Sequence, residues 1–197
     1  MPRVALVFWS LLLAALPATS ANDAKPDPWA PVRFLIGRWE GTTRGEPGDG
    51  TVVRTYEFVL GNRFVHERNV STYPPQEKNK SGEVHEHWSF LSYDRPRKAL
   101  VLRQFHTEGF VNQYSHRTTN AATKQIVFES EAFENLPAGW RAREIYDVLG
   151  PDEFTETFQL AEPGKEFQTY SKNHFKRTAA QAKVLDATPQ ERYFTLH

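Results

Sequence analysis

Histidines and carboxylates at regular spacing have the clearest chemical potential in this chain. Glu83, His85 and His87 recur at every second position, so in a β-strand their side chains would lie on one face. Two imidazoles at that spacing can chelate a metal ion, and Glu83 or Glu86 can complete or orient such a site. The stretch is a candidate metal site, although no cysteine and no third ligand at a readable spacing accompany the two histidines.

The other face of the same stretch is apolar and favours a different position for the histidines. Val84, Trp88 and Phe90 alternate with them, and an apolar strand face ordinarily packs against the core. We therefore expect His85 and His87 on the outside of the fold, where they would be solvated side chains without a metal.

A second polar group, His106, Tyr114 and His116, is a set of candidate ligand contacts. His106 ends one predicted strand at a hairpin, and Tyr114 and His116 share a face of the next strand with Phe110. A wall of hydrogen-bonding side chains suits a ligand cavity, whereas a tight core avoids it. These three residues are therefore candidates for lining an interior cavity.

Two arginines on otherwise apolar strand faces are candidate anchors for an acidic head group. Arg68 shares a face with Phe64, and Arg103 shares one with Val101 and Phe105. A guanidinium binds carboxylates in a two-pronged way, so either arginine would hold the acidic end of a ligand or pair with an interior carboxylate. The alternative is an arginine whose stem lies on apolar surface while its charged end stays in water.

Two carboxylates, Glu144 and Glu156, share strand faces with aromatic residues and are candidate inward groups. Such groups would be available for acid or base chemistry. No grouping of serine, histidine and aspartate and no glycine-rich phosphate loop accompanies them. The sequence therefore favours binding over catalysis and leaves enzymatic activity open.

The elements that must position these residues are short β-strands. From Gly37 onward, segments rich in Val, Phe, Tyr, Trp and Thr alternate with clusters of Gly, Pro, Asn and Asp, which is typical of consecutive strands joined by tight turns. We predict ten strands, at 37–44, 50–60, 62–71, 82–93, 97–106, 109–117, 124–132, 140–148, 153–160 and 165–176.

Ten sequential strands with few helices predict an all-β fold whose sheet closes on itself as an antiparallel up-and-down barrel. Such a barrel is wider than the eight-stranded kind that its own side chains just fill, so it leaves room for a small ligand. The segment 30–36, which follows Pro28, is expected to form one or two turns of helix that plug one end of the barrel.

The first residues resemble an export signal. One basic residue, Arg3, precedes an apolar run at 4–16, and small residues follow up to Ala21. This is the layout of a secretory signal peptide, whereas a membrane-spanning helix needs a longer run. We predict cleavage after Ala21 and a secreted or periplasmic protein with no membrane span after that cleavage.

The predicted organisation has four parts: a signal peptide at 1–21, a polar leader at 22–29, one β-barrel domain at 30–177 and a peripheral tail at 178–197. Removal of the signal leaves 23 basic and 24 acidic side chains, and no basic stripe marks a nucleic-acid partner. Cysteine is absent, so packing or a ligand must stabilise the fold without disulfides. Nothing in the sequence indicates an oligomeric state.

The stretch FLIGRWEG, residues 34–41, places Gly37, Trp39 and Gly41 at spacing two straight after an apolar run. A tryptophan at the entry of the first strand supplies a large apolar body that seals one end of a barrel, and glycines beside it let the backbone pack closely. We assign these three residues to barrel closure rather than to ligand contact.

FLIGRWEG resembles the opening of the calycin-type barrels, which include lipocalins and fatty-acid-binding proteins, and among them that of the nitrobindin-like haem-binding β-barrel family. A second stretch, FHTEGF at 105–110, is similar to the His-x-Glu and Gly-aromatic pattern midway through those barrels, with a spacing one residue shorter. The similarity extends over residues 30–177.

The resemblance implies an open-mouthed barrel that binds haem, with iron held by a histidine on or near the last strand and with nitric oxide or peroxynitrite chemistry at that iron. His174 is the histidine of the predicted last strand and therefore the candidate iron ligand. Lys172 and Lys176 share its face and favour the alternative, a histidine exposed to solvent.

Three functions are open at this point. The first is an exported barrel that binds a small hydrophobic or amphipathic ligand, such as a fatty acid or another lipid. The second is a haem-binding protein of the nitrobindin kind, and haem is the one cofactor that the resemblance suggests. The third is a ligand-free barrel that serves as a structural or interaction module.

Overall fold

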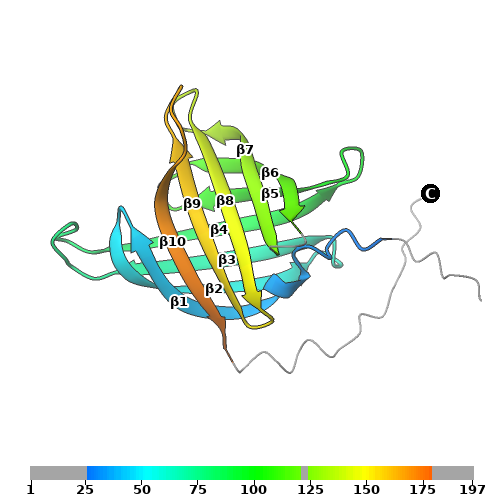
Figure 1. The fold of residues 1–197 in the computed structure, drawn as a ribbon, viewed down its shortest axis with the longest axis horizontal. Helices are drawn as coiled ribbons and strands as arrows, with labels where there is room; N and C mark the ends of the chain where they lie inside the picture. The colour runs from blue at the N-terminus through cyan, green and yellow to red at the C-terminus, as the bar shows by residue number, and fades with distance from the viewer. Residues whose placement is uncertain (1–25, 121–123, 179–197) are drawn as a thin grey trace, which may run out of the picture.

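The computed structural model describes residues 26–120 and 124–178, and ten strands of this part of the chain form a closed antiparallel barrel (Figure 1). Each strand pairs with its neighbours in sequence, and β1 pairs with β10 to close the sheet. The strands are β1 (Gly37–Gly45), β2 (Gly48–Val59), β3 (Phe64–Tyr73), β4 (Glu83–Asp94), β5 (Ala99–His106), β6 (Val111–Asn120), β7 (Gln125–Glu134), β8 (Arg141–Gly150), β9 (Glu153–Ala161) and β10 (Gln168–Arg177).

The predicted all-β up-and-down barrel is confirmed, and every strand lies within three residues of its predicted bounds. One 3-10 turn, η1 (Arg33–Leu35), precedes β1 where the sequence predicts one or two helical turns.

The predicted signal peptide at 1–21 and the predicted tail beyond residue 178 lie outside the described residues. Within 26–120 and 124–178, no helix is long and apolar enough to cross a membrane.

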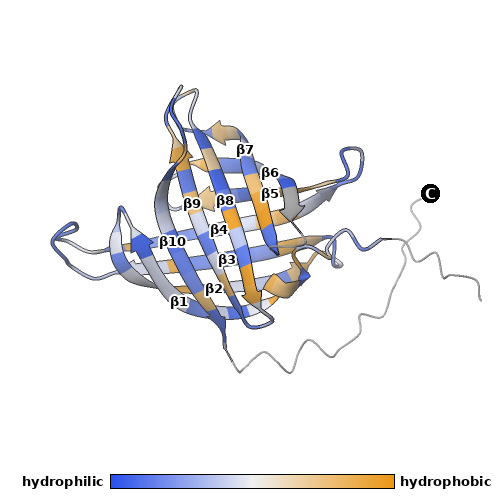
Figure 2. Ribbon diagram, viewed as in Figure 1, coloured by the Kyte–Doolittle hydropathy of each residue, from blue (hydrophilic) through white to orange (hydrophobic). Residues whose placement is uncertain are grey.

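Apolar and hydrophilic residues alternate along the strands (Figure 2), but the apolar side does not always face inward. On β4, Val84 and Trp88 are 63% and 48% exposed on the outer face, while His87 is buried inside the barrel and His85 is half-buried beside it. The prediction that these two histidines lie outside the fold is therefore wrong. The reason is that the inner wall at this end bounds a cavity and not a packed core.

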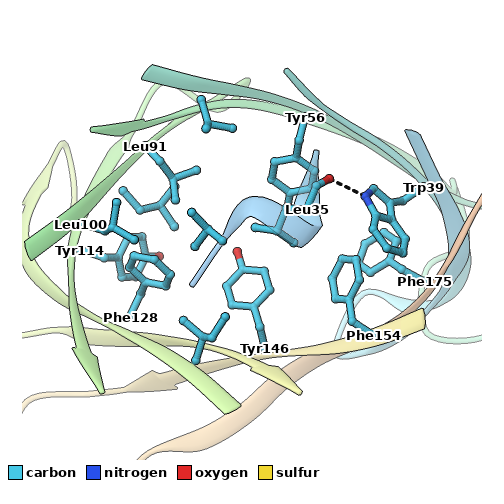
Figure 3. Packing of buried hydrophobic residues seen from close by; sticks show 14 of the residues in the cluster. Leu35, Trp39, Tyr56, Leu91, Leu100, Tyr114, Phe128, Tyr146, Phe154 and Phe175 are labelled. Carbon is cyan, nitrogen blue, oxygen red and sulfur yellow. Dashed lines mark hydrogen bonds between the residues drawn. The ribbon is translucent and has the colours of Figure 1, made fainter. Parts of the chain in front are cut away.

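The half of the interior next to the chain's entry is tightly packed around Trp39. The indole Nε1 of this fully buried residue donates a hydrogen bond of 2.6 Å to the carbonyl oxygen of Leu35, and its ring packs edge-on against Phe154 with 4.7 Å between centroids. Figure 3 shows this bond at one side of the packed interior, together with side chains that point inward from strands around the barrel. These include Tyr56, Leu91, Leu100, Tyr114, Phe128, Tyr146 and Phe175.

Glycine is required both at the start of β1 and at the seam between β1 and β10. Gly37 has a φ of 131°, a conformation that favours a residue without a Cβ. A Cβ on Gly41 would collide with the carbonyl group of His174 on β10. Arg177 then covers the seam, because its guanidinium lies 4.1 Å from the centre of the Trp39 ring and donates to two backbone carbonyls of the segment before β1.

Candidate ligand cavity and histidine cluster

The other half of the interior is a cavity of about 560 Å³, which lies within the range of roughly 300–1,000 Å³ that is typical of small-ligand sites. Residues from the loops that join β1 to β2, β5 to β6 and β7 to β8 line it. Its mouth therefore lies at the barrel end opposite the packed core.

The wall of the cavity changes character with depth. Near the mouth it is mostly apolar, and the side chains there are Tyr73, Phe110, Phe133, Leu136, Trp140, Phe158, Leu160 and Tyr170. Deeper in the barrel it is polar, and the buried side chains there are Arg54, Asn69, Gln104, Asn112, Glu144, Glu156 and Asn173.

A buried ion network centres on Arg54, which is 2% exposed. Its guanidinium lies 3.1 Å from a carboxylate oxygen of Glu67 and 2.7 Å from one of Glu156. Burial alone would raise the pKa of Glu67, but Arg54 and a hydrogen bond to His87 lower that pKa to about 2. Burial likewise opposes ionisation of Glu156, but Arg54 holds its pKa below the ordinary value. One guanidinium thus faces two ionised carboxylates.

A second buried carboxyl group, that of Glu144, lies beside this network. Burial, and then the negative charge of Glu156, raise the pKa of Glu144 well above its ordinary value. Both carboxyl groups are buried and line the cavity, on the inward faces that their strand patterns predict. The deep wall therefore holds two neighbouring carboxyl groups whose pKa values are shifted in opposite directions.

Three histidines from β4 and β5 converge on the cavity wall. His85 and His87 lie two residues apart on β4, and His106, at the end of β5, pairs with His87 in the strand register. The Nε2 atom of His85 lies 3.5 Å from Nδ1 of His87 and 3.4 Å from Nδ1 of His106. This group of side chains could hold a metal ion, since one ring nitrogen from each lies within 4.8 Å of the others.

The outward nitrogens of two of these rings contact carboxylates. Nε2 of His87 lies 3.2 Å from an oxygen of the fully buried Glu67. Nδ1 of His85 lies 2.8 Å from an oxygen of Glu108, which comes from the β5–β6 loop. Both rings are therefore held by hydrogen bonds on the side that faces away from the third histidine.

His106 is held differently. Its ring stacks on Phe110 with 4.1 Å between centroids, and its Nε2 lies 3.2 Å from the side-chain amide nitrogen of Asn112. Burial, followed by the charges of His87 and His85, lowers the pKa of His106 to about 2. The imidazole of His106 is therefore neutral at physiological pH.

Of the three candidates for lining a cavity, His106 does so and the other two do not. Tyr114 is fully buried in the packed half, where its hydroxyl accepts a hydrogen bond of 3.0 Å from Asn112. The ring of His116 lies 5.6 Å from that of Phe128, a member of the packed core.

Arg68 and Arg103, the candidate anchors for an acidic head group, lie on the outer wall and not in the cavity. Arg68 is exposed and pairs with Glu86 at 2.8 Å. Arg103 donates to Gln113 at 3.0 Å and to Ser92 at 3.2 Å. Neither arginine lines the cavity, and Phe105, which shares a strand face with Arg103, is 46% exposed.

His174, the candidate iron ligand, also lies outside. Its side chain is 44% exposed on the outer face of β10, and its Nε2 lies 2.7 Å from an oxygen of Glu153 on β9. The structure thus corrects the assignment of His174 as an interior iron ligand. The alternative, a solvent-exposed histidine, is the arrangement observed.

Comparison with known proteins supports the fold and adds no family. No protein-family model matches the chain, and no curated protein matches it. Among solved structures, the chain is similar to the crystal structure of Rv2717c from M. tuberculosis, with a TM-score of 0.55 and 15% identity over 78% of this chain and 98% of that chain. At this identity the likeness shows the fold alone. Fold and cavity together define the chain as a closed ten-stranded β-barrel whose interior has room for a ligand.

Proposed function

We propose that this protein is an exported barrel that binds a small amphipathic molecule in its cavity. The observation that carries the proposal is the division of the cavity wall into an apolar mouth and a polar, charged interior. Such a wall suits a ligand that has an apolar body and a hydrogen-bonding end. Export is supported by the signal-peptide pattern at 1–21.

The charge of the deep wall determines which kind of polar group on a ligand fits there. Arg54 is the one basic lysine or arginine side chain among the described residues that line the cavity, and Glu67 and Glu156 already pair with it. An acidic head group would therefore meet no unpaired cation and would face excess negative charge. A neutral or positively charged end, such as an alcohol, an amide or an amine, fits this wall better than a fatty-acid carboxylate.

The haem alternative has less support from the residues present. The resemblance implies a last-strand histidine on the iron, and His174 lies on the outer wall. The residues therefore do not fit the implied arrangement. The module alternative requires a filled interior, whereas the cavity measures about 560 Å³.

Binding of fluorescent probes to the mature, tag-free protein tests the proposal. We expect 1-aminoanthracene, a neutral amphipathic dye, to bind at least about tenfold more tightly than anthracene-9-carboxylate, a difference of about 1.4 kcal/mol in binding free energy. Ser171→Phe fills the cavity wall and should abolish dye binding. Lys172→Phe places the same ring on the neighbouring outward position and should leave dye binding unchanged.

Two results would go against the proposal. One is equal dye binding by the wild type and a Ser171→Phe variant whose circular dichroism shows an intact barrel. The other is a haemin titration that gives a sharp Soret band with the wild type and none with His106→Ala, which would restore the haem alternative.

A further inference from the structure

The spacing of the three cavity histidines matches that of ligands around a tetrahedral ion. Zinc lies about 2.0–2.1 Å from imidazole nitrogen, so two ligand nitrogens of a tetrahedral site stand about 3.4 Å apart. The separations from Nε2 of His85 to Nδ1 of His87 and to Nδ1 of His106 are 3.5 Å and 3.4 Å. Two of the three separations among these ligand nitrogens are therefore already close to the value that a bound ion would impose, and one ring nitrogen from each histidine lies within 4.8 Å of the others.

The hydrogen bonds behind two of the rings direct lone pairs toward the same point. A carboxylate only accepts hydrogen bonds, so Nδ1 of His85 must donate to Glu108 and Nε2 of His87 must donate to Glu67. When both rings are neutral, the other nitrogen of each ring carries a lone pair, and those two nitrogens face each other. Two lone pairs that face each other repel, whereas a cation bound between the two nitrogens would be coordinated by both. A carboxylate behind a histidine is also the arrangement that orients metal-bound imidazoles.

The surrounding charge favours a cation at this point. Glu67 is completely buried, and it shares Arg54 with a second ionised carboxylate, Glu156. Two carboxylates and one guanidinium leave excess negative charge next to His87. Buried charge that is not fully paired is costly, and a bound divalent ion would offset it.

We propose that His85, His87 and His106 form a binding site for a divalent transition-metal ion, with Zn²⁺ as the ion that fits best. Imidazole nitrogen suits zinc, copper, nickel and iron rather than magnesium or calcium. All three histidines line the cavity, so the fourth coordination position faces the cavity and is open to water or to a donor group of a bound molecule. The site does not depend on the ligand class proposed above.

A neighbouring group competes for one of the same residues. Glu83, His85 and Glu108 also bring one ligand atom each within 4.8 Å of one another. Glu83 and Glu108 are exposed, whereas His87 is buried and His106 is half-buried. Exposed acidic groups gather without binding an ion more readily than buried imidazoles do, so the histidine group is the site proposed, and the experiment separates the two.

Metal titration of the mature, tag-free protein tests the proposal. After treatment with a chelator, the protein is titrated with Zn²⁺ against a chromophoric competitor, and Co²⁺ is added in parallel because its visible absorption reports four-coordinate geometry. We expect one equivalent of tightly bound Zn²⁺ and the intense absorption of tetrahedral Co²⁺. His87→Ala and His106→Ala should each weaken Zn²⁺ binding by more than about 100-fold, the upper end of what loss of an outer hydrogen-bond partner causes.

Three control variants make the result specific. His66→Ala and His174→Ala remove histidines of the outer wall and should leave Zn²⁺ affinity unchanged. Glu83→Gln should also leave it unchanged, whereas a large loss in that variant would assign the ion to the exposed acidic group and overturn the proposal. His87→Ala leaves Glu67 without its partner and is therefore at risk of not folding. In that case, His85→Gln and His106→Gln serve as the test variants in its place. Wild-type affinity in the folded His85 and His106 variants, or no Zn²⁺ bound by the wild type, would also overturn the proposal.

Discussion

At the scale of single residues, Arg54 holds together the charged part of the interior. It pairs with Glu67 and Glu156, both buried, and these carboxylates would otherwise be left charged in a poorly solvated wall. Breaking a buried ion pair by removal of one partner costs about 3–5 kcal/mol. We therefore expect Arg54→Met to lower the free energy of unfolding by about 3–5 kcal/mol, as measured by urea denaturation at neutral pH.

The matched control is an arginine with a similar ion pair in water. Arg68 lies 2.8 Å from Glu86 on the outer wall, where solvent screens the interaction. Arg68→Met should change the free energy of unfolding much less than Arg54→Met. Comparable losses in the two variants would show that burial does not determine how much the Arg54 network contributes to the free energy of unfolding.

Glu144 should give stability a dependence on pH. Its pKa in the folded protein is raised above the ordinary value of 4.5 by burial and then by Glu156. The stability that it contributes is therefore fully present below the unfolded pKa and is lost as the pH rises toward the folded pKa, by about 1.4 kcal/mol for each unit that the pKa is raised. Glu144→Gln keeps a neutral side chain of the same shape and has no proton to lose.

We expect the unfolding free energy of Glu144→Gln, relative to the wild type, to increase between about pH 5 and pH 8. Urea denaturation of both proteins across this range measures the difference. A difference that stays constant with pH would mean that the carboxyl of Glu144 titrates normally in the folded protein.

At the scale of elements, closure of the sheet depends on how closely β1 approaches β10. An added Cβ on Gly41 meets the backbone carbonyl of His174, and a paired backbone gives way less easily than a side chain. Gly41→Ala should therefore destabilise the fold by about 1–3 kcal/mol, the usual cost of overpacking. Gly150→Ala is the control, because a Cβ there meets nothing within 4 Å. Thermal and urea unfolding of the two variants should separate them, and a neutral Gly41→Ala would contradict the tight seam.

The strands could be predicted from the sequence, but the side of each strand that faces inward could not always be. Alternating residues and turn clusters placed all ten strands within three residues of their bounds. On β4, however, Val84 and Trp88 form the outer face, because the inner face borders a cavity that hydrogen-bonding residues can line. An alternating pattern indicates that the two faces of a strand differ, but it does not indicate which face lies inside the barrel.

The grouping of the three histidines could not be predicted from the sequence either, because it depends on how two strands pair. His106 meets His85 and His87 only because β5 pairs with β4 so that His106 lies opposite His87, and spacing along one strand cannot reveal that partner. Arg54 did have a signal in the sequence. It lies midway between Val52 and Tyr56, two apolar residues of the same predicted strand that are both buried, so strict alternation places it inside.

At the scale of the whole molecule, the barrel is packed at one end and hollow at the other. Amide groups near the packed end, such as those of Leu102 and Phe128, should exchange hydrogen only when the whole protein unfolds. Amides beside the mouth, such as those of Phe133 and Ser171, should exchange through smaller local openings. Native-state hydrogen exchange measures both groups, and uniform protection along β7 and β10 would contradict this division.

Closure of the sheet also sets the order in which the molecule can be assembled. Arg177 bonds to the carbonyl of Ile36, a residue 141 positions earlier in the chain, and pairings between such distant segments form slowly. A nascent chain that has been made only as far as β9 has no second neighbour for β1 and therefore no enclosed compartment. Any cargo must consequently be acquired after synthesis of the last strand, from the surroundings in which the finished protein finds itself.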